Sequence, residues 1–215
     1  ASAPSVNGEI VQATDVLFNG DLLLVSYNFK GDPHLGVLQV IDVTNPSTPV
    51  LEYEVLMENA DLNRIRIYRD RYLVVASGTA DEAASLKIFD VQGPPTMLSS
   101  IDLYSNQATM VTIHDDYALV TTGDDGGVIG VNLQDPSTPE MVFFYPLSDA
   151  RYVEMLSDDE VLLVTGGPNA SLIRIPWSDL TSEDDQGPMT IGIDDGSNIV
   201  TLPLNGLTVG APSWG

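Results

Sequence analysis

A short stretch of the chain concentrates cationic groups that could bind an anion. The segment "NRIRIYRDRY" (63–72) holds four arginines, which is half of the 8 lysine and arginine residues in the protein. If it is a strand, its side chains alternate, so that the isoleucines share one face and Arg64, Arg66 and Tyr68 share the other. Two neighbouring guanidinium groups can hold a carboxylate or a phosphate in a bidentate manner. The sequence therefore offers Arg64, Arg66 and Tyr68 as a ligand-binding set.

The same arginines could instead be neutralised within the protein. Aspartate and glutamate outnumber lysine and arginine by 31 to 8. Asp15 and Glu154 stand at matching places in other segments of the chain and are the nearest candidates by position. We favour this pairing with protein carboxylates over a ligand site, because a charged guanidinium in a narrow channel must meet an opposite charge.

Acidic loops are a second candidate for chemistry, because hard oxygen ligands suit Ca²⁺. They occur at 123–127, 157–160, 181–187 and 192–198. None has the alternating spacing of an EF-hand loop. The residues that could hold such an ion are Asp194, Asp195 and Asn198 in "DDGSN", together with Asp124 and Asp125 in "GDDGG". The alternative is a set of solvated loops without a metal, and no other cofactor is expected.

Catalytic motifs are weak in this sequence. There is no cysteine, and His34 and His114 are the two histidines. No "GxSxG" elbow is present to mark a serine nucleophile. Among the many acids, no pair stands out as the two carboxylates of a glycosidase. An enzyme is therefore the less favoured class, although a hydrolase or lyase site in a central channel stays open as an alternative.

The elements that would position these residues form an internal repeat. Four segments each show short strands rich in β-branched residues, separated by turns, at intervals of about 45 residues. The second strands are "DLLLVS" (21–26), "RYLVVAS" (71–77), "DYALVTT" (116–122) and "EVLLVTG" (160–166), which align on Val25, Val75, Val120 and Val164. Four strands per unit at this period are typical of a propeller blade.

A proline turn follows the third strand in most repeats. Two of these turns have nearly the same sequence, "IDVTNPSTP" and "VNLQDPSTP". The residues at the equivalent position before the turn are Asp42, Asp90 and Asn132. A short carboxylate or amide there can accept backbone N–H bonds, and Pro46 presets the first corner. We expect this repeated motif to be a structural hairpin device and not a functional site.

With these motifs the chain resembles the LVIVD-repeat β-propellers, which are bacterial and archaeal secreted or surface proteins. "VLFNGDLLLVS" with "GVLQVIDVTNPSTP", and "VTIHDDYALVTT" with "GGVIGVNLQDPSTP", carry the resemblance. It implies an all-β fold, a β-propeller of four-stranded antiparallel blades in a single domain (1–215). The expected blades are 13–58, 59–105, 107–147 and 150–193, with 194–215 as a tail or a further blade. Partial blades at both ends suggest a piece of a larger propeller.

Composition and charge limit the partners. The formal net charge of −23 repels nucleic acid and anionic lipid. No apolar run approaches the roughly 18 residues that span a bilayer, so no membrane insertion is expected. The excess of aspartate over lysine is typical of a halophilic or marine source, with an ordinary acidic secreted protein as the alternative.

The function that we expect is a non-catalytic binding, adhesion or assembly module outside the cytoplasm, either extracellular, on the cell surface or periplasmic. It would present its loops to a protein or a glycan. The alternatives are the channel enzyme and a structural unit of a larger surface assembly, in which the chain associates with the remainder of a propeller.

Overall fold

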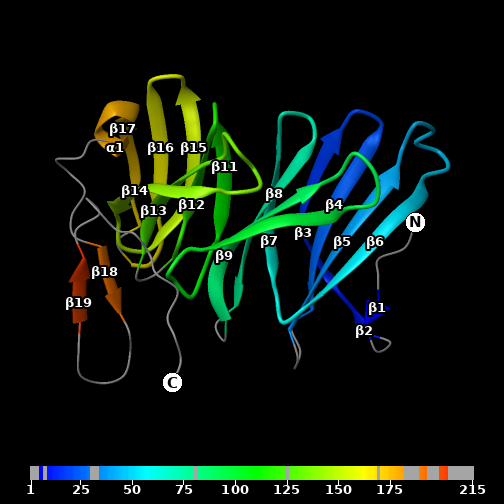
Figure 1. The fold of residues 1–215 in the computed structure, drawn as a ribbon, viewed down its shortest axis with the longest axis horizontal. Helices are drawn as coiled ribbons and strands as arrows, with labels where there is room; N and C mark the ends of the chain where they lie inside the picture. Colours follow the sequence, from blue (N-terminus) through cyan, green and yellow to red (C-terminus); the bar gives the residue numbers. More distant parts are fainter. Residues whose placement is uncertain are drawn as a thin grey trace.

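The computed structural model describes residues 5–6, 9–29, 34–79, 82–123, 126–168, 170–181, 189–192 and 199–202. The regular secondary structure of these residues is almost entirely β-strand, which confirms the all-β prediction (Figure 1). The strands form four antiparallel sheets that follow one another in chain order, three with four strands and one with three. None of the described helices is long and apolar enough to cross a bilayer.

Each sheet is a meander of consecutive strands. The first sheet contains β3 (Gln12–Asn19), β4 (Leu22–Phe29), β5 (Leu35–Asp42) and β6 (Val50–Glu58). The second contains β7 (Leu62–Tyr68), β8 (Tyr72–Thr79), β9 (Glu82–Asp90) and β10 (Thr96–Asp102). The third contains β11 (Met110–His114), β12 (Tyr117–Thr121), β13 (Gly127–Asn132) and β14 (Glu140–Pro146). The fourth contains β15 (Ala150–Ser157), β16 (Glu160–Thr165) and β17 (Leu172–Pro176).

Two short hairpins complete the described strands. They are β1 (Ser5–Val6) with β2 (Glu9–Ile10), and β18 (Met189–Gly192) with β19 (Ile199–Leu202).

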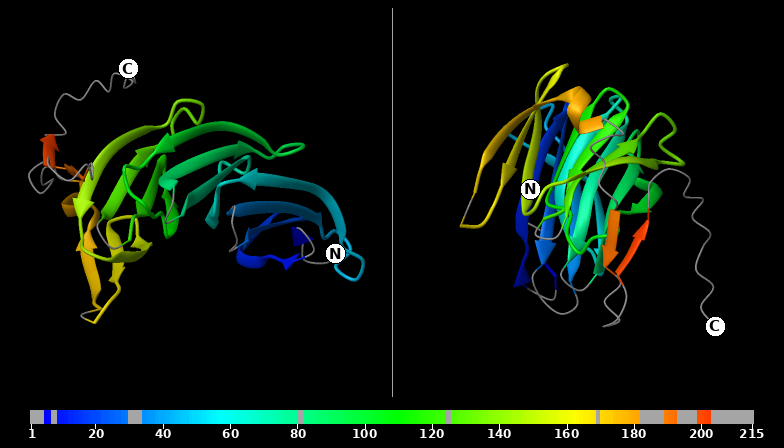
Figure 2. Two further views of the ribbon diagram at one scale, coloured as in Figure 1. Left: turned by 90° about the horizontal axis from the view of Figure 1, so that it is seen from below. Right: turned by 90° about the vertical axis from the view of Figure 1, so that its left-hand side faces the viewer.

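The four sheets are stacked along an arc. The first strands contact one another in series, β3 with β7, β7 with β11 and β11 with β15, so they lie side by side along one edge of the stack. We call this the inner edge. Over the described ranges the arc stays open and does not close into a ring (Figure 2, left). The described sheets therefore follow one another along an open arc, and no closed propeller is seen among them.

Apolar layers between consecutive sheets hold the arc together. Leu24 and Leu38 of the first sheet pack against Ile65, Leu73 and Phe89 of the second, and all five are buried. A similar layer joins the second sheet to the third, and another joins the third to the fourth. Burial of these side chains stabilises each junction by roughly 1.5–3 kcal/mol per side chain. Each inner sheet is thus covered on both faces.

The repeat in the fourth sheet is shifted by one residue relative to the sequence alignment. In the first three sheets the aligned valine stands three positions after the residue that opens the second strand at the hairpin. In the fourth sheet the hairpin pair is Ser157 with Glu160, so the equivalent residue is Leu163 and not Val164. Leu163 is buried against the third sheet. Because strand side chains alternate, this shift moves Val164 to the opposite face.

The proline turns are built as the sequence predicted. The side chains of Asp42, Asp90 and Asn132 accept backbone N–H bonds from Thr44 at 2.7 Å, Gln92 at 3.0 Å and Gln134 at 2.8 Å. In the two nearly identical motifs, a second turn follows in which Asn45 and Asp135 each accept the N–H of the serine two residues on. The repeated sequence motif therefore forms a turn that is held by local hydrogen bonds.

The fourth sheet ends differently from the others. A short helix, α1 (Trp177–Thr181), follows its third strand. The Trp177 ring contacts His114 at 4.7 Å, Tyr117 at 5.9 Å and Phe143 at 6.0 Å between ring centres. Leu180 of the helix is buried in the same cluster. These contacts fix α1 on the third sheet.

Candidate functional site

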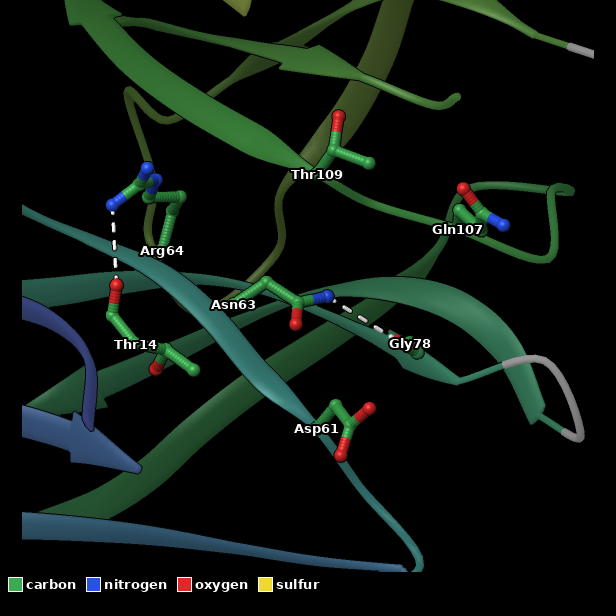
Figure 3. Close-up of a pocket in the computed structure, with 7 residues that line it drawn as sticks. All are labelled: Thr14, Asp61, Asn63, Arg64, Gly78, Gln107 and Thr109. Carbon is green, nitrogen blue, oxygen red and sulfur yellow. Dashed lines mark hydrogen bonds between the residues drawn. The ribbon is translucent and has the colours of Figure 1, made fainter. Parts of the chain in front are cut away.

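A polar pocket of about 390 Å³ lies at the inner edge, where the first three sheets meet (Figure 3). The residues that line it come from β3, from β7 and the residue before it, from the end of β8 and from the segment before β11. They are Thr14, Asp61, Asn63, Arg64, Gly78, Gln107 and Thr109. The pocket therefore draws on three repeats, which lie far apart in the sequence.

Bulges at the start of the first strands create much of this lining. The register shifts at Thr14 in β3, at Asn63 in β7 and at Arg151 in β15. Thr109 directly precedes β11 at the corresponding place. A bulge leaves one residue outside the ladder and redirects its side chain. Each repeat thus presents a polar side chain at the same end of its first strand.

Three of these side chains connect consecutive first strands. The Thr14 hydroxyl donates to the carbonyl of Leu62. The Asn63 amide donates to the carbonyl of Ala108 at 2.8 Å, and the Thr109 hydroxyl donates to the carbonyl of Ala150 at 3.5 Å. The three acceptors occupy the same repeat position. These bonds link each inner strand to the next along the pocket.

Arg64 supplies the cationic group of the pocket. Its Nη1 lies 3.2 Å from the carbonyl oxygen of Thr14 and 3.5 Å from Asp15 Oδ1. The side chain is 40% exposed. A guanidinium has five N–H donors, so these two contacts leave donors that can face the pocket.

Arg66 contacts both the first and the third sheet from β7. Its Nη1 lies 3.1 Å from Asp15 Oδ2, and Nη2 reaches the sulfur of Met110 at 4.0 Å. Asp15 therefore pairs with both arginines, as one of the two alternatives from the sequence had it. Glu154 does not take part in this pairing, because it accepts a bond from the Thr112 hydroxyl at 2.9 Å instead.

Tyr68 lies at the far end of β7 from the pocket. It is buried, and its hydroxyl donates to Asp116 on the third sheet. The guanidinium of Arg69 stacks on the Tyr68 ring at 4.7 Å and pairs with Asp116 at 2.9 Å. Burial, with the bond to Asp116, raises the pKa of Tyr68 to about 12. The structure thus separates Tyr68 from Arg64 and does not bring the three predicted residues to one place.

The sequence reasoning missed the rest of the pocket. Asp61, Asn63, Gln107 and Thr109 carried no motif by themselves. The signal that could have found them is the repeat, because the equivalent residues Thr14, Asn63, Thr109 and Arg151 are polar in all four segments. Only the register of the bulge shows that these residues face one another.

The proposed calcium ligands cannot be placed. Asp124, Asp125, Asp194, Asp195 and Asn198 lie outside the described residues. Within the part of the chain that the structure describes, no group of three His, Cys, Asp or Glu side chains could hold a metal ion.

Comparison with known proteins adds no relative. No family model matches the chain, and no curated protein matches it.

Proposed function

We propose that the four sheets are blades of a β-propeller of the LVIVD-repeat type, and that the protein is a non-catalytic glycan-binding module outside the cytoplasm. The observation that carries this proposal is the pocket at the inner edge, which joins three repeats around one cationic side chain. The side-by-side first strands support the propeller, since in that fold the first strand of each blade lines the centre.

The chemistry of the pocket suits a sugar unit that carries a carboxylate. The Gln107 amide offers donors for hydroxyl groups, and the Thr109 hydroxyl oxygen can accept a further bond. Arg64 would anchor the carboxylate of the ligand through its outward donors. A nucleic acid is a poor ligand for a chain of net charge −23, because many phosphates would meet the acidic surface.

Binding is a better reading of this lining than catalysis. The hydroxyls of Thr14 and Thr109 donate to backbone carbonyls. Neither hydroxyl is hydrogen-bonded to a basic side chain that could activate it, among the described contacts of the pocket. A nucleophile requires such a partner. We therefore place no reaction at this site.

Calorimetric titration with galacturonic acid and with galactose, each as the single sugar, tests the proposal. We expect the acidic sugar to bind more tightly, and Arg64→Gln to weaken its binding by about tenfold or more, which corresponds to roughly 1.4 kcal/mol. Arg69→Gln is the matched control, since it removes the same charge from the turn that follows the far end of β7. No binding of either sugar, or an equal loss in the control, would contradict the proposal.

A further inference from the structure

The first and fourth sheets each leave one face without a neighbouring sheet among the described residues. In the first sheet it is the face turned away from the second sheet, and in the fourth it is the face turned away from the third. We call these the first outer face and the fourth outer face. Both carry large exposed apolar side chains, including Phe18 at 68% and Leu172 at 72% exposure.

The first outer face repeats positions that pack against a neighbouring sheet elsewhere, although Val11, which precedes β3, covers part of it in a cluster with Ile41. A groove of about 410 Å³ is lined by Phe18, Leu23, Ile41, Val43, Pro46 and Pro49. By hairpin register, the first four of these correspond to Ile67, Leu73, Phe89 and Val91 in the second sheet and to Ile113, Ala118, Val131 and Leu133 in the third. In both of those sheets the corresponding residues pack against the preceding sheet. The groove is therefore equivalent to the surface that, in the second and third sheets, packs against the preceding sheet.

The fourth outer face repeats the opposite side of a junction. Leu162 and Leu172 occupy positions that belong in the first three sheets to Leu24 and Leu38, Val74 and Leu86, and Leu119 and Val128. All six of those side chains are fully buried against the following sheet. Leu162 is half-buried and Leu172 is exposed. The fourth outer face therefore carries the side chains that pack on the following sheet in the other repeats, but no described sheet lies against it.

The polar contacts of the junctions follow the same logic. Thr14, Asn63 and Thr109 each donate to a carbonyl on the next first strand. Arg151 occupies the equivalent position in the fourth sheet. Its long side chain is a hydrogen-bond donor, and its contacts include Asp149 and Gln107. The carbonyl at the receiving repeat position of the first sheet belongs to Ala13. Arg151 therefore stands where a donor to the carbonyl of Ala13 in another copy of the chain would stand.

We propose that a second copy of this chain binds head to tail, with the fourth outer face of one copy on the first outer face of the other. A second copy supplies a neighbouring sheet for both faces at once, and the contact reproduces the junctions already present within the chain. Such an interface is heterologous, and two arcs can close on each other through two junctions. The inference does not depend on the glycan, because the pocket lies at the inner edge of the first three sheets.

Sedimentation velocity and native mass spectrometry of the 215-residue chain test this proposal. Measurements belong in 1 M NaCl, where screening removes the repulsion between two chains of net charge −23. We expect the chains to associate, either as a closed dimer or as a series of larger oligomers that are built from the same contact. Phe18→Glu and Leu172→Glu should each raise the dissociation constant by about 30-fold or more, because every junction in either variant contains a buried charge.

Mixing the two variants gives the decisive result. The mixture contains one intact pair of faces, so a heterodimer should form although neither variant associates alone. Met97→Glu is the control, since Met97 is exposed on β10 of the second sheet, which has a neighbouring sheet on both faces. A monomeric chain at 1 M NaCl, an effect from Phe18→Glu without one from Leu172→Glu, or no heterodimer on mixing would each overturn the proposal.

Discussion

Strand β7 makes two polar junctions, and they differ in where the carboxylate lies. Toward the first sheet, Arg64 and Arg66 meet Asp15, whose side chain is 13% exposed. Toward the third sheet, Tyr68 and Arg69 meet Asp116, whose side chain is 41% exposed. Both junctions combine one carboxylate with arginine, so the difference between them is burial.

Asp15 differs from Asp116 in the number of its donors as well as in its burial. Asp15 also accepts the backbone N–H groups of Val16 at 2.9 Å and Ile65 at 3.0 Å. Ile65 is fully buried, and its N–H would lose a partner if Asp15 were removed. Exposed ion pairs contribute little, typically about 0–1 kcal/mol. Asp15 is therefore a structural centre of the arc, and Asp116 is a peripheral contact.

The largest effect is expected at Asp15. Asp15→Ala should lower the free energy of unfolding by about 3 kcal/mol, because it leaves a buried N–H without its acceptor and two guanidiniums without their carboxylate. Asp15→Asn keeps one acceptor oxygen and should cost less. Chemical denaturation of both variants measures this. A loss for Asp15→Ala no greater than that for Asp116→Ala would break the comparison.

A smaller effect is expected at Tyr68. Tyr68→Phe keeps the buried ring and removes only the bond to Asp116, so it should cost about 1 kcal/mol. The thermal melting temperature of the variant measures it. The ring should still stack with Arg69, and Arg69→Gln in the Tyr68→Phe background should add little further loss. A loss as large as that for Asp15→Ala would show that the second junction is as central as the first.

The smallest effect is a pH dependence of the second junction. Bonds from Tyr68 and Arg69 hold the pKa of Asp116 below its ordinary value. Stability from this group is therefore present above the ordinary pKa of about 3.9 and is lost as the pH falls through the folded value. The pKa of Tyr68 is raised to about 12, so its contribution is full below about pH 10 and is lost as the pH rises through the folded value.

Asp116→Asn tests this dependence, because it removes the acidic titration and weakens the alkaline one. The free energy of unfolding should be measured between about pH 2 and pH 12, the range over which both groups titrate. It should change less with pH in the variant than in the parent chain. An unchanged profile would mean that the second junction contributes nothing to the pH dependence of stability.

The sequence predicted the strands and the turns well, because their causes are local. Alternating β-branched residues and proline turns act within a few residues, and the Asx bonds of Asp42 and Asn132 appear as expected. It also offered Asp15 as a partner for the arginines, through the repeat. The pocket was not predicted, because the bulge at Asn63 changes which way the start of β7 faces.

The sequence by itself determined the all-β class, the repeat of about 45 residues and the strong negative charge, since periodicity and composition need no tertiary contact. Only the tertiary structure decided that Asp15 and not Glu154 meets Arg64 and Arg66, and that Leu163 and not Val164 faces the third sheet. The physical reason is that strand side chains alternate. A one-residue change at a bulge or hairpin reverses every direction that follows, and pairing between sheets depends on those directions.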